Sequence, residues 1–208
     1  ARMRHMAGML DGVRIDHFRG IESYYAIPGK AVTAKEGKWE KGPGMKLIHA
    51  LQDICSEKLV IAEDLGEITP EVIRLVEESG FPGMRVFQFA FLGDGNSPHR
   101  PHNYIHNCVA YTGTHDNNTL LGYLWEMDEP TRARVLEYCG HEGPWQQGCR
   151  AILRTLFASG ADTLILPVQD LLGYGADTRI NTPGTARGNW RYRLAREQFL
   201  DIDAARFL

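Results

Sequence analysis

The sequence has few cysteines and no long apolar run, and both absences exclude classes of protein. Its four cysteines among 208 residues lie far apart and form no CxxC pair, so neither a disulfide scaffold nor a zinc site is expected. We expect reduced thiols, which are typical of cytoplasmic proteins. No segment approaches the roughly 20 apolar residues of a membrane-spanning helix, and no apolar signal core follows the N-terminal arginines.

An excess of charge of one sign is also lacking. The chain has 23 Lys and Arg residues against 26 Asp and Glu residues, for a net charge of −3. No basic block favours nucleic acid, and no acidic tail suggests a disordered arm. The composition, 43% apolar and 24% charged, is that of a globular protein with a buried core. A neutral substrate therefore fits better than a polyanion, and we expect neither a nucleic-acid nor a membrane partner.

Short apolar runs that end in polar clusters recur along the chain. Near-continuous apolar runs of this length suit strands buried on both faces, as in a parallel sheet covered by helices. Helical patterns separate most of them, so the sequence predicts an α/β fold, either an open doubly wound sheet or part of a (β/α)₈ barrel. The expected strands are 9–15, 58–62, 84–91, 108–111 and 163–167, and the expected helices are 44–56, 69–79, 130–139 and 147–159.

Three of these strands end on an acid, namely Asp16, Glu63 and Asp116. Catalytic groups of β/α folds gather at the carboxyl ends of the strands, so a parallel sheet would bring these acids to one edge. Arg14 lies two residues before Asp16, on the same face of the strand, where its charge favours an ionised carboxylate. Glu63 follows an apolar strand, where desolvation would favour the protonated form that a general acid requires. His115, next to Asp116, is a hydrogen-bonding partner for a sugar hydroxyl.

Other readings of these acids remain open. A carboxylate at a strand end is often a helix cap or part of a salt bridge, and Asp16 has Arg14 and Arg19 nearby. A divalent-metal site is a second alternative, but no DxD or HxH pair supports it. Paired carboxylates are the usual equipment for cleaving glycosides, one acting as nucleophile and the other as acid and base.

Several strings of the sequence resemble glycoside hydrolase family 77, the 4-α-glucanotransferases or amylomaltases. The resemblance runs nearly from end to end, and several strings are specific to this family rather than to amylase-like barrels in general. The strings are 14–20 (RIDHFRG), 61–66 (IAEDLG), 111–119 (YTGTHDNNT), 167–173 (PVQDLLG), 181–185 (NTPGT) and 188–190 (GNW).

The resemblance implies a (β/α)₈ TIM barrel of the α-amylase class. It makes Asp16 the nucleophile, Glu63 the acid/base and Asp116 a carboxylate that stabilises the transition state. Arg14 would orient the nucleophile, and His115 would hold a sugar hydroxyl. The implied reaction is a retaining double displacement on a maltooligosaccharide or a starch- or glycogen-type glucan, without a cofactor or a metal.

Four further residues are candidates for substrate binding. His17 resembles a family position near the sugar, and Asn117 would contact substrate or steady the loop that holds Asp116. Asp170, taken to end the last strand, would bind substrate or fix a loop. Trp39, in an expected long loop, would cover a sugar face or act as a hydrophobic plug.

Family members are much longer than this chain. By the matched strings, residues 1–208 form a partial catalytic domain with barrel strands four to eight, without the N-terminal strands and the inserted subdomains. Five strands cannot close an eight-stranded barrel, so we expect an inactive or nearly inactive fragment whose partner is the missing N-terminal part of the same polypeptide. The rival hypotheses are a non-catalytic glucan-binding or assembly fragment and a hydrolase of the wider amylase class.

Overall fold

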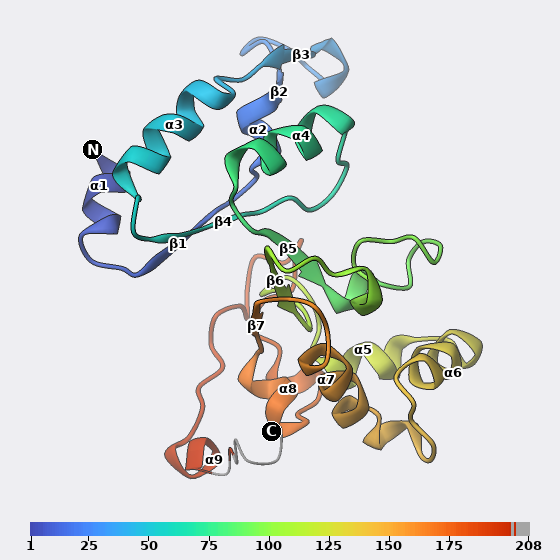
Figure 1. Cartoon of the computed structure of the whole chain (residues 1–208). Coiled ribbons are helices and arrows are strands. Elements are labelled where there is room, and N and C mark those ends of the chain that lie inside the picture. The colour runs from blue at the N-terminus through green and yellow to red at the C-terminus, as the bar shows by residue number, and fades with distance from the viewer. Residues whose placement is uncertain (201, 203–208) are drawn as a thin grey trace. The chain divides into compact units, whose positions relative to one another are not determined.

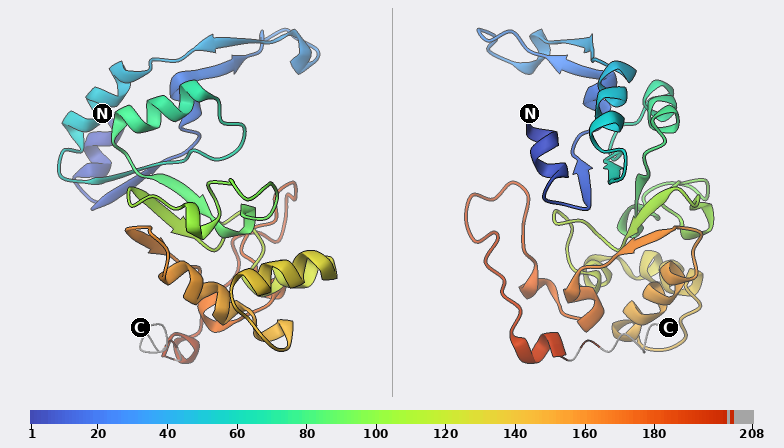
Figure 2. Two further views of the ribbon diagram at one scale, coloured as in Figure 1. Left: turned by 45° about the vertical axis from the view of Figure 1, so that its right-hand side comes forward. Right: turned by 60° about the vertical axis from the view of Figure 1, so that its left-hand side comes forward.

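The computed structural model describes residues 1–200 and 202, and it divides into two compact units. The first unit is Ala1–Met84 and the second is Arg85–Leu208, so the division falls within strand β5 (Gly83–Val86). Each unit has its own apolar core, and each is described by itself (Figures 1 and 2).

The first unit is built on parallel strands. β1 (Gly12–Ile15) pairs with β4 (Leu59–Ala62), and Ala62 pairs in parallel with Gly83 at the start of β5. A separate antiparallel pair consists of β2 (Ser23–Ala26) and β3 (Lys38–Lys41). The helices are α1 (Arg2–Ala7), α2 (Arg19–Glu22), α3 (Met45–Ile54) and α4 (Pro70–Ser79), with a 3₁₀ turn at Ala34–Glu36.

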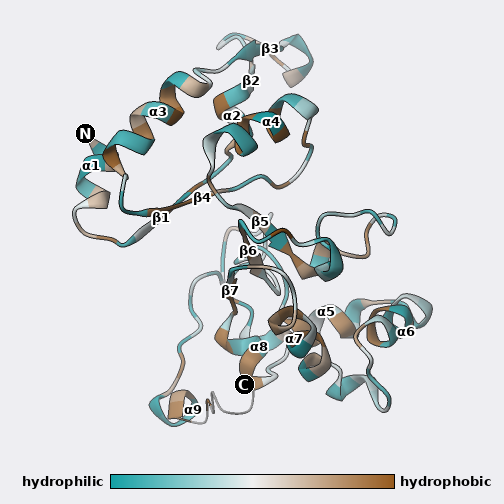
Figure 3. Cartoon of the chain, viewed as in Figure 1, coloured by the Kyte–Doolittle hydropathy of each residue, from teal (hydrophilic) through white to brown (hydrophobic). Residues whose placement is uncertain are grey.

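Helices α3 and α4 pack against each other. Each carries both hydrophobic and hydrophilic residues, drawn in brown and teal in Figure 3. Their apolar faces contribute Ile48, Leu51 and Leu75 to a core that also contains Phe18 and Ala62. Helix α4 begins and ends as the sequence predicts, with Pro in its first turn and Gly80 in the left-handed conformation after its last residue. The hydroxyl of Thr69, expected to cap this helix, makes no capping hydrogen bond.

The second unit contains the parallel pair β6 (Cys108–Tyr111) and β7 (Thr163–Ile165). Its core is formed by β6 together with buried side chains of the three helices that follow β6 in the chain. Ala110, Leu124 and Ile152 are among the buried residues. The helices are α5 (Leu120–Glu126), α6 (Glu129–Tyr138), α7 (Cys149–Phe157), α8 (Val168–Leu172) and α9 (Arg196–Leu200), with 3₁₀ turns at Phe87–Phe89, Pro101–Asn103, Trp145–Gln147 and Ala176–Thr178.

The five strands expected from the apolar runs are all present, but several are shorter than predicted. The largest difference is at 84–91, where the strand ends at Val86 and the chain continues as a 3₁₀ turn. Phe87 is fully buried in that turn, and the N–H of Gln88 donates to the carbonyl of Thr112. An apolar run can therefore stay buried without remaining extended, and this is why hydrophobicity alone placed the end of the strand too late.

We predict that Gly42→Ala destabilises the chain. A Cβ on Gly42 would come under 3.0 Å from the backbone carbonyl of Ile21, and a backbone atom cannot move aside as a flexible side chain can. Overpacking of this kind costs about 1–3 kcal/mol. The urea midpoint of Gly42→Ala should fall, whereas that of Gly29→Ala should not, because a Cβ on Gly29 meets nothing within 4 Å. Equal midpoints for the two variants would contradict this packing.

Candidate active site

The pairing of β1 with β4 brings Asp16 and Glu63 to the same edge of the first unit. Ile15 and Ala62, the last residues of the two strands, lie opposite each other in the parallel register. Asp16 and Glu63 are the residues that follow them. The backbone continues the ladder, because the N–H of Glu63 donates to the carbonyl of Ile15 at 3.0 Å. The two carboxylates, which are far apart in the sequence, therefore leave the ends of neighbouring strands, as the sequence predicted.

The turn after Asp16 holds the side chain of Glu63. The backbone N–H of His17 donates to Oε2 of Glu63 at 2.6 Å, and the N–H of Leu65 donates to Oε1 at 3.0 Å. His17 has a φ of 49°, in the left-handed region that residues other than glycine seldom adopt. Strained backbone of this kind is concentrated at functional sites. His17 thus contributes a backbone donor, a role that the sequence did not suggest.

These contacts change the expected surroundings of Glu63. The sequence predicted a desolvated acid at the end of an apolar strand, but Glu63 is only half-buried, and both of its oxygens accept backbone N–H groups. Such donors hold the carboxylate in place.

Asp16 forms an ion pair with Arg14. Nη1 of Arg14 lies 2.8 Å from Oδ1 of Asp16, and Nε of Arg14 lies 3.3 Å from the sulfur of Met84. The two side chains meet on one side of the chain, as predicted, although Asp16 follows β1 and does not belong to it. The Asp16 side chain is 77% exposed, so the pair adds little to stability, and its effect is to orient the carboxylate.

In the second unit, Asp116 lies in the loop between β6 and α5 and is held by residues near the C-terminus. Nδ2 of Asn181 donates to Oδ1 of Asp116 at 2.6 Å, and Nη2 of Arg179 donates to its backbone carbonyl at 2.7 Å. Nε2 of His115 lies 3.4 Å from Oδ2. Neither Asn181 nor Arg179 was predicted as a site residue, although Asn181 opens one of the strings that carry the family resemblance.

An exposed tryptophan stands beside this loop. The rings of Trp190 and His115 lie 5.6 Å apart at an interplanar angle of 39°, and Trp190 is 65% exposed. Trp190 adopts a φ of 61°, and its N–H donates to the carbonyl of Ile180 at 2.6 Å. The sequence did not single it out as a site residue, since nothing in its neighbours indicates that the chain returns to Asp116.

Asn117 steadies the loop of Asp116, which is one of its two expected roles. Its Oδ1 accepts hydrogen bonds from the backbone N–H of Thr114 at 2.8 Å and from the Thr114 hydroxyl at 2.9 Å.

Asp170 does not end a strand, contrary to the sequence prediction. It lies in α8 and is only 2% exposed. Its oxygens accept from the Thr112 hydroxyl at 2.5 Å and from the N–H of Leu120, at the start of α5, at 2.7 Å. These contacts match the expected role of fixing a loop and leave little of Asp170 exposed for substrate.

Trp39 also differs from its expected setting. It lies in β3 rather than in a long loop, and it is 54% exposed, so it is not a buried hydrophobic plug.

Among residues 1–200 and 202, no three His, Cys, Asp or Glu residues are grouped so that they could hold a metal ion. Over the same residues, no helix is both long enough and apolar enough to cross a membrane. The four cysteines are free, and burial raises the pKa of the Cys139 thiol to about 11.

An α/β fold with two carboxylates at the ends of neighbouring parallel strands is typical of enzymes that cleave glycosidic bonds. A family model described as 4-alpha-glucanotransferase, glycoside hydrolase family 77, matches residues 1–198. The chain belongs to this family, as its resemblance predicted.

Individual relatives agree with this assignment. The chain is 46% identical over 198 residues to a 4-alpha-glucanotransferase of Streptococcus pneumoniae, across 95% of this chain and 39% of that protein. It is 41% identical over 197 residues to a chloroplastic/amyloplastic 4-alpha-glucanotransferase of Arabidopsis thaliana, across 93% of this chain and 33% of that protein. The chain thus spans well under half the length of these relatives.

A solved structure supports the fold. The amylomaltase from Streptococcus agalactiae, determined in complex with acarbose, matches with a TM-score of 0.87 and 36% identity. The match covers 99% of this chain and 41% of that one. The chain therefore has the fold of part of an α/β TIM barrel.

We predict that Asp170 makes stability depend on pH. Burial raises the pKa of its carboxyl above the ordinary value, with the donors from Leu120 and Thr112 acting in the opposite direction. A raised pKa means that the folded state binds the proton more tightly, so stability is lost as pH rises from the ordinary value of 3.8 through the folded pKa.

The matched variant is Asp170→Asn, whose amide can still accept from Leu120 and can donate to the Thr112 hydroxyl but does not ionise. Urea unfolding across pH 4 to 8 should show the wild type losing stability relative to Asp170→Asn as pH rises. Parallel curves would contradict the assignment. Asp170→Ala leaves both donors unpaired and should cost about 1–3 kcal/mol at every pH.

Proposed function

We propose that this chain is the C-terminal catalytic part of a 4-α-glucanotransferase, which moves α-1,4-linked glucan segments to glucose or glucan acceptors. One observation carries the proposal, namely that the register of β1 and β4 sets Asp16 and Glu63 side by side at one edge of the unit. Membership of the family supports it, and the names of the relatives supply the substrate class.

The first step is displacement of the leaving glucan. Glu63 donates a proton to the glycosidic oxygen while Asp16 attacks the anomeric carbon, so that a β-linked glucosyl-enzyme forms as the glycosidic bond breaks. Arg14 pairs with Asp16 and orients its carboxylate. The donors from His17 and Leu65 fix the position of Glu63.

The second step returns the segment to an acceptor. Glu63, now a carboxylate, takes the proton from an acceptor hydroxyl, and that oxygen displaces Asp16 with the α linkage restored. Transfer exceeds hydrolysis when a bound sugar excludes water from the glucosyl-enzyme.

We assign Asp116 the role of stabilising the positive charge that develops on the sugar. Asn181 and Arg179 keep its loop and carboxylate in place. His115 would hold a sugar hydroxyl, and the imidazole of His17 would lie near the sugar. Asn117 and Asp170 act through the loops that they fix, and the exposed Trp190 offers an aromatic face beside His115.

We further propose that the chain works as part of a longer polypeptide, in which its strands are barrel strands four to eight and residues 1–208 are part of one catalytic domain. The missing N-terminal part would supply the remaining strands and part of the glucan cleft. A cytoplasmic location fits the free cysteines, and the plastid relatives in plants indicate that location varies within the family.

Disproportionation of maltotriose tests this function in the longer polypeptide. Asp16→Asn and Glu63→Gln should each lower kcat by about 10³-fold or more, because each removes a group that makes or breaks a bond. The matched controls are Asp53→Asn and Glu57→Gln, which alter exposed acids on the same unit and should leave kcat unchanged. Full activity in Asp16→Asn would overturn the proposal.

The 208-residue chain alone should release little or no glucose from maltotriose, because five strands cannot enclose the cleft. Glucose release by the isolated chain at a rate close to that of the longer polypeptide would refute this second prediction but not the assignment of the acids.

A further inference from the structure

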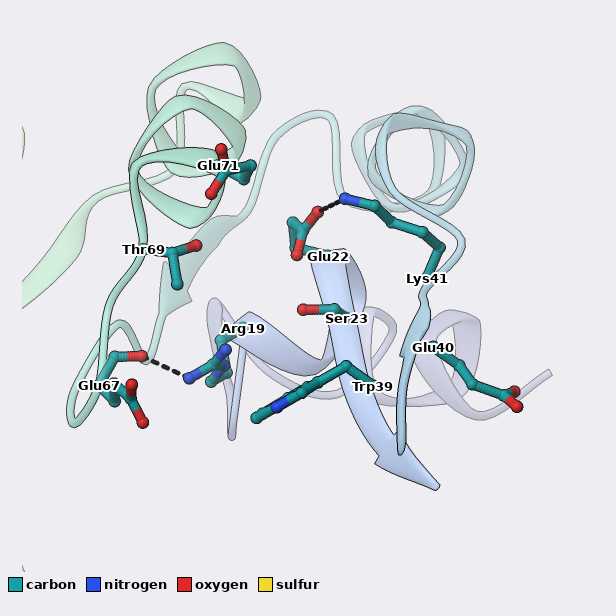
Figure 4. Close-up of a pocket in the computed structure, with 9 residues that line it drawn as sticks. All are labelled: Arg19, Glu22, Ser23, Trp39, Glu40, Lys41, Glu67, Thr69 and Glu71. Atoms are coloured by element: carbon teal, nitrogen blue, oxygen red, sulfur yellow. Dashed lines mark hydrogen bonds and ion pairs between the residues drawn. The ribbon is translucent and has the colours of Figure 1, made fainter. Parts of the chain in front are cut away.

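The first unit contains a pocket of about 320 Å³ that lies outside the Asp16 and Glu63 pair (Figure 4). This volume is at the lower end of the range for small-molecule sites, about 300–1,000 Å³. It is lined by α2, the β2–β3 pair and the start of α4. The lining residues are Arg19, Glu22, Ser23, Trp39, Glu40, Lys41, Glu67, Thr69 and Glu71.

The pocket is linked to the carboxylate pair through the chain itself. Arg19 is the third residue after Asp16, and Glu67 is the fourth after Glu63. Nη1 of Arg19 donates to the carbonyl of Glu67 at 2.5 Å, which ties together the segments that leave β1 and β4 (Figure 4). The pocket is therefore built on the segments that follow the two carboxylates in the chain.

Arg19 presents a buried donor that has no acceptor among the described residues. The side chain belongs to a residue only 8% exposed, and its Nε makes no hydrogen bond. A buried N–H without an acceptor costs free energy. Because neighbouring atoms cover Nε, a ligand oxygen in the pocket reaches it only if the lining side chains shift.

Trp39 forms an aromatic wall whose position is fixed from two sides. The guanidinium carbon of Arg19 lies 4.5 Å from the centre of the Trp39 ring. Tyr25 lies opposite Trp39 in the β2–β3 register, and the two rings meet edge-on with their centres 5.4 Å apart. The indole nevertheless remains 54% exposed. A large exposed aromatic surface that is held in place in this way provides apolar contact area at a small cost in side-chain entropy.

The charges of the lining favour a neutral ligand over an anion. Four of the lining residues are glutamates, and only Arg19 and Lys41 are cationic. The hydrogen bond from Lys41 lowers the pKa of Glu22. The pKa of Glu71 is lowered by a hydrogen bond from the backbone N–H of Glu71 itself. Both residues are therefore carboxylates at neutral pH. Carboxylates repel phosphate or sulfate but accept hydrogen bonds from hydroxyl groups.

We infer that this pocket binds sugar units of an α-1,4-glucan, with one sugar ring against the exposed face of Trp39. The glutamates of the lining accept hydrogen bonds from the hydroxyl groups of the sugar. The choice of an α-glucan rests on the proposed function, whereas the choice of a neutral polyhydroxy ligand rests on the pocket.

Titration of maltoheptaose into the 208-residue chain labelled with ¹⁵N-tryptophan tests the inference. The four tryptophans are Trp39, Trp125, Trp145 and Trp190, and the Trp39 indole signal is identified by its loss in Trp39→Phe. It should shift saturably with maltoheptaose, and those of Trp125 and Trp145 should not. Inorganic phosphate at the same concentrations should leave Trp39 unchanged.

Trp39→Ala should weaken maltoheptaose binding about five- to tenfold, since one stacking contact is lost. Trp125→Ala, at a 72% exposed tryptophan of the second unit, is the matched control and should bind as the wild type does. A Trp190 shift without a Trp39 shift, a response of Trp39 to phosphate alone, or no shift at all would overturn the inference. A saturable Trp39 shift in a chain whose longer polypeptide does not disproportionate maltotriose would uphold the pocket and refute the proposed function.

Discussion

The parallel register of β1 with β4 is the constraint on which the proposed chemistry depends. Ile15 opposite Ala62 makes the next residues, Asp16 and Glu63, neighbours. A slip of one residue would turn one carboxylate to the other face of its strand and separate the pair. Val60, Ile61 and Ala62 of β4 are all buried, so both faces of this strand are covered and a slip would disturb the packing on each.

Several functional contacts extend from that ladder. The left-handed turn at His17 holds Glu63 through a backbone N–H, and Arg14 holds Asp16 from the same strand. Beyond the turn, Arg19 connects the two segments through Glu67 and forms a wall of the Trp39 pocket. The catalytic acids and the inferred sugar pocket are therefore positioned by the same two strand ends.

The sequence was most informative where a feature is periodic or lies at a strand end. The parallel strands, helix α4, the shared face of Arg14 and Asp16, and the adjacency of Asp16 to Glu63 follow from alternation, capping residues and parallel pairing. Contacts between segments far apart in the sequence could not be read from periodicity. They include Asn181 with Asp116, Trp190 with His115, the burial of Asp170 and the β2–β3 pair around Trp39, because each depends on where a loop returns in space.

The central claim is that Asp16 is the nucleophile and Glu63 its acid/base partner. It is tested most directly with Glu63→Gln in the longer polypeptide and an α-maltosyl fluoride as donor. Fluoride leaves without protonation, so Asp16 should be glycosylated, while the missing base slows release to the acceptor. Mass spectrometry of proteolytic peptides should then find a maltosyl group on the peptide that contains Asp16. No label on that peptide, or a label on the peptide that contains Asp116, would contradict the account.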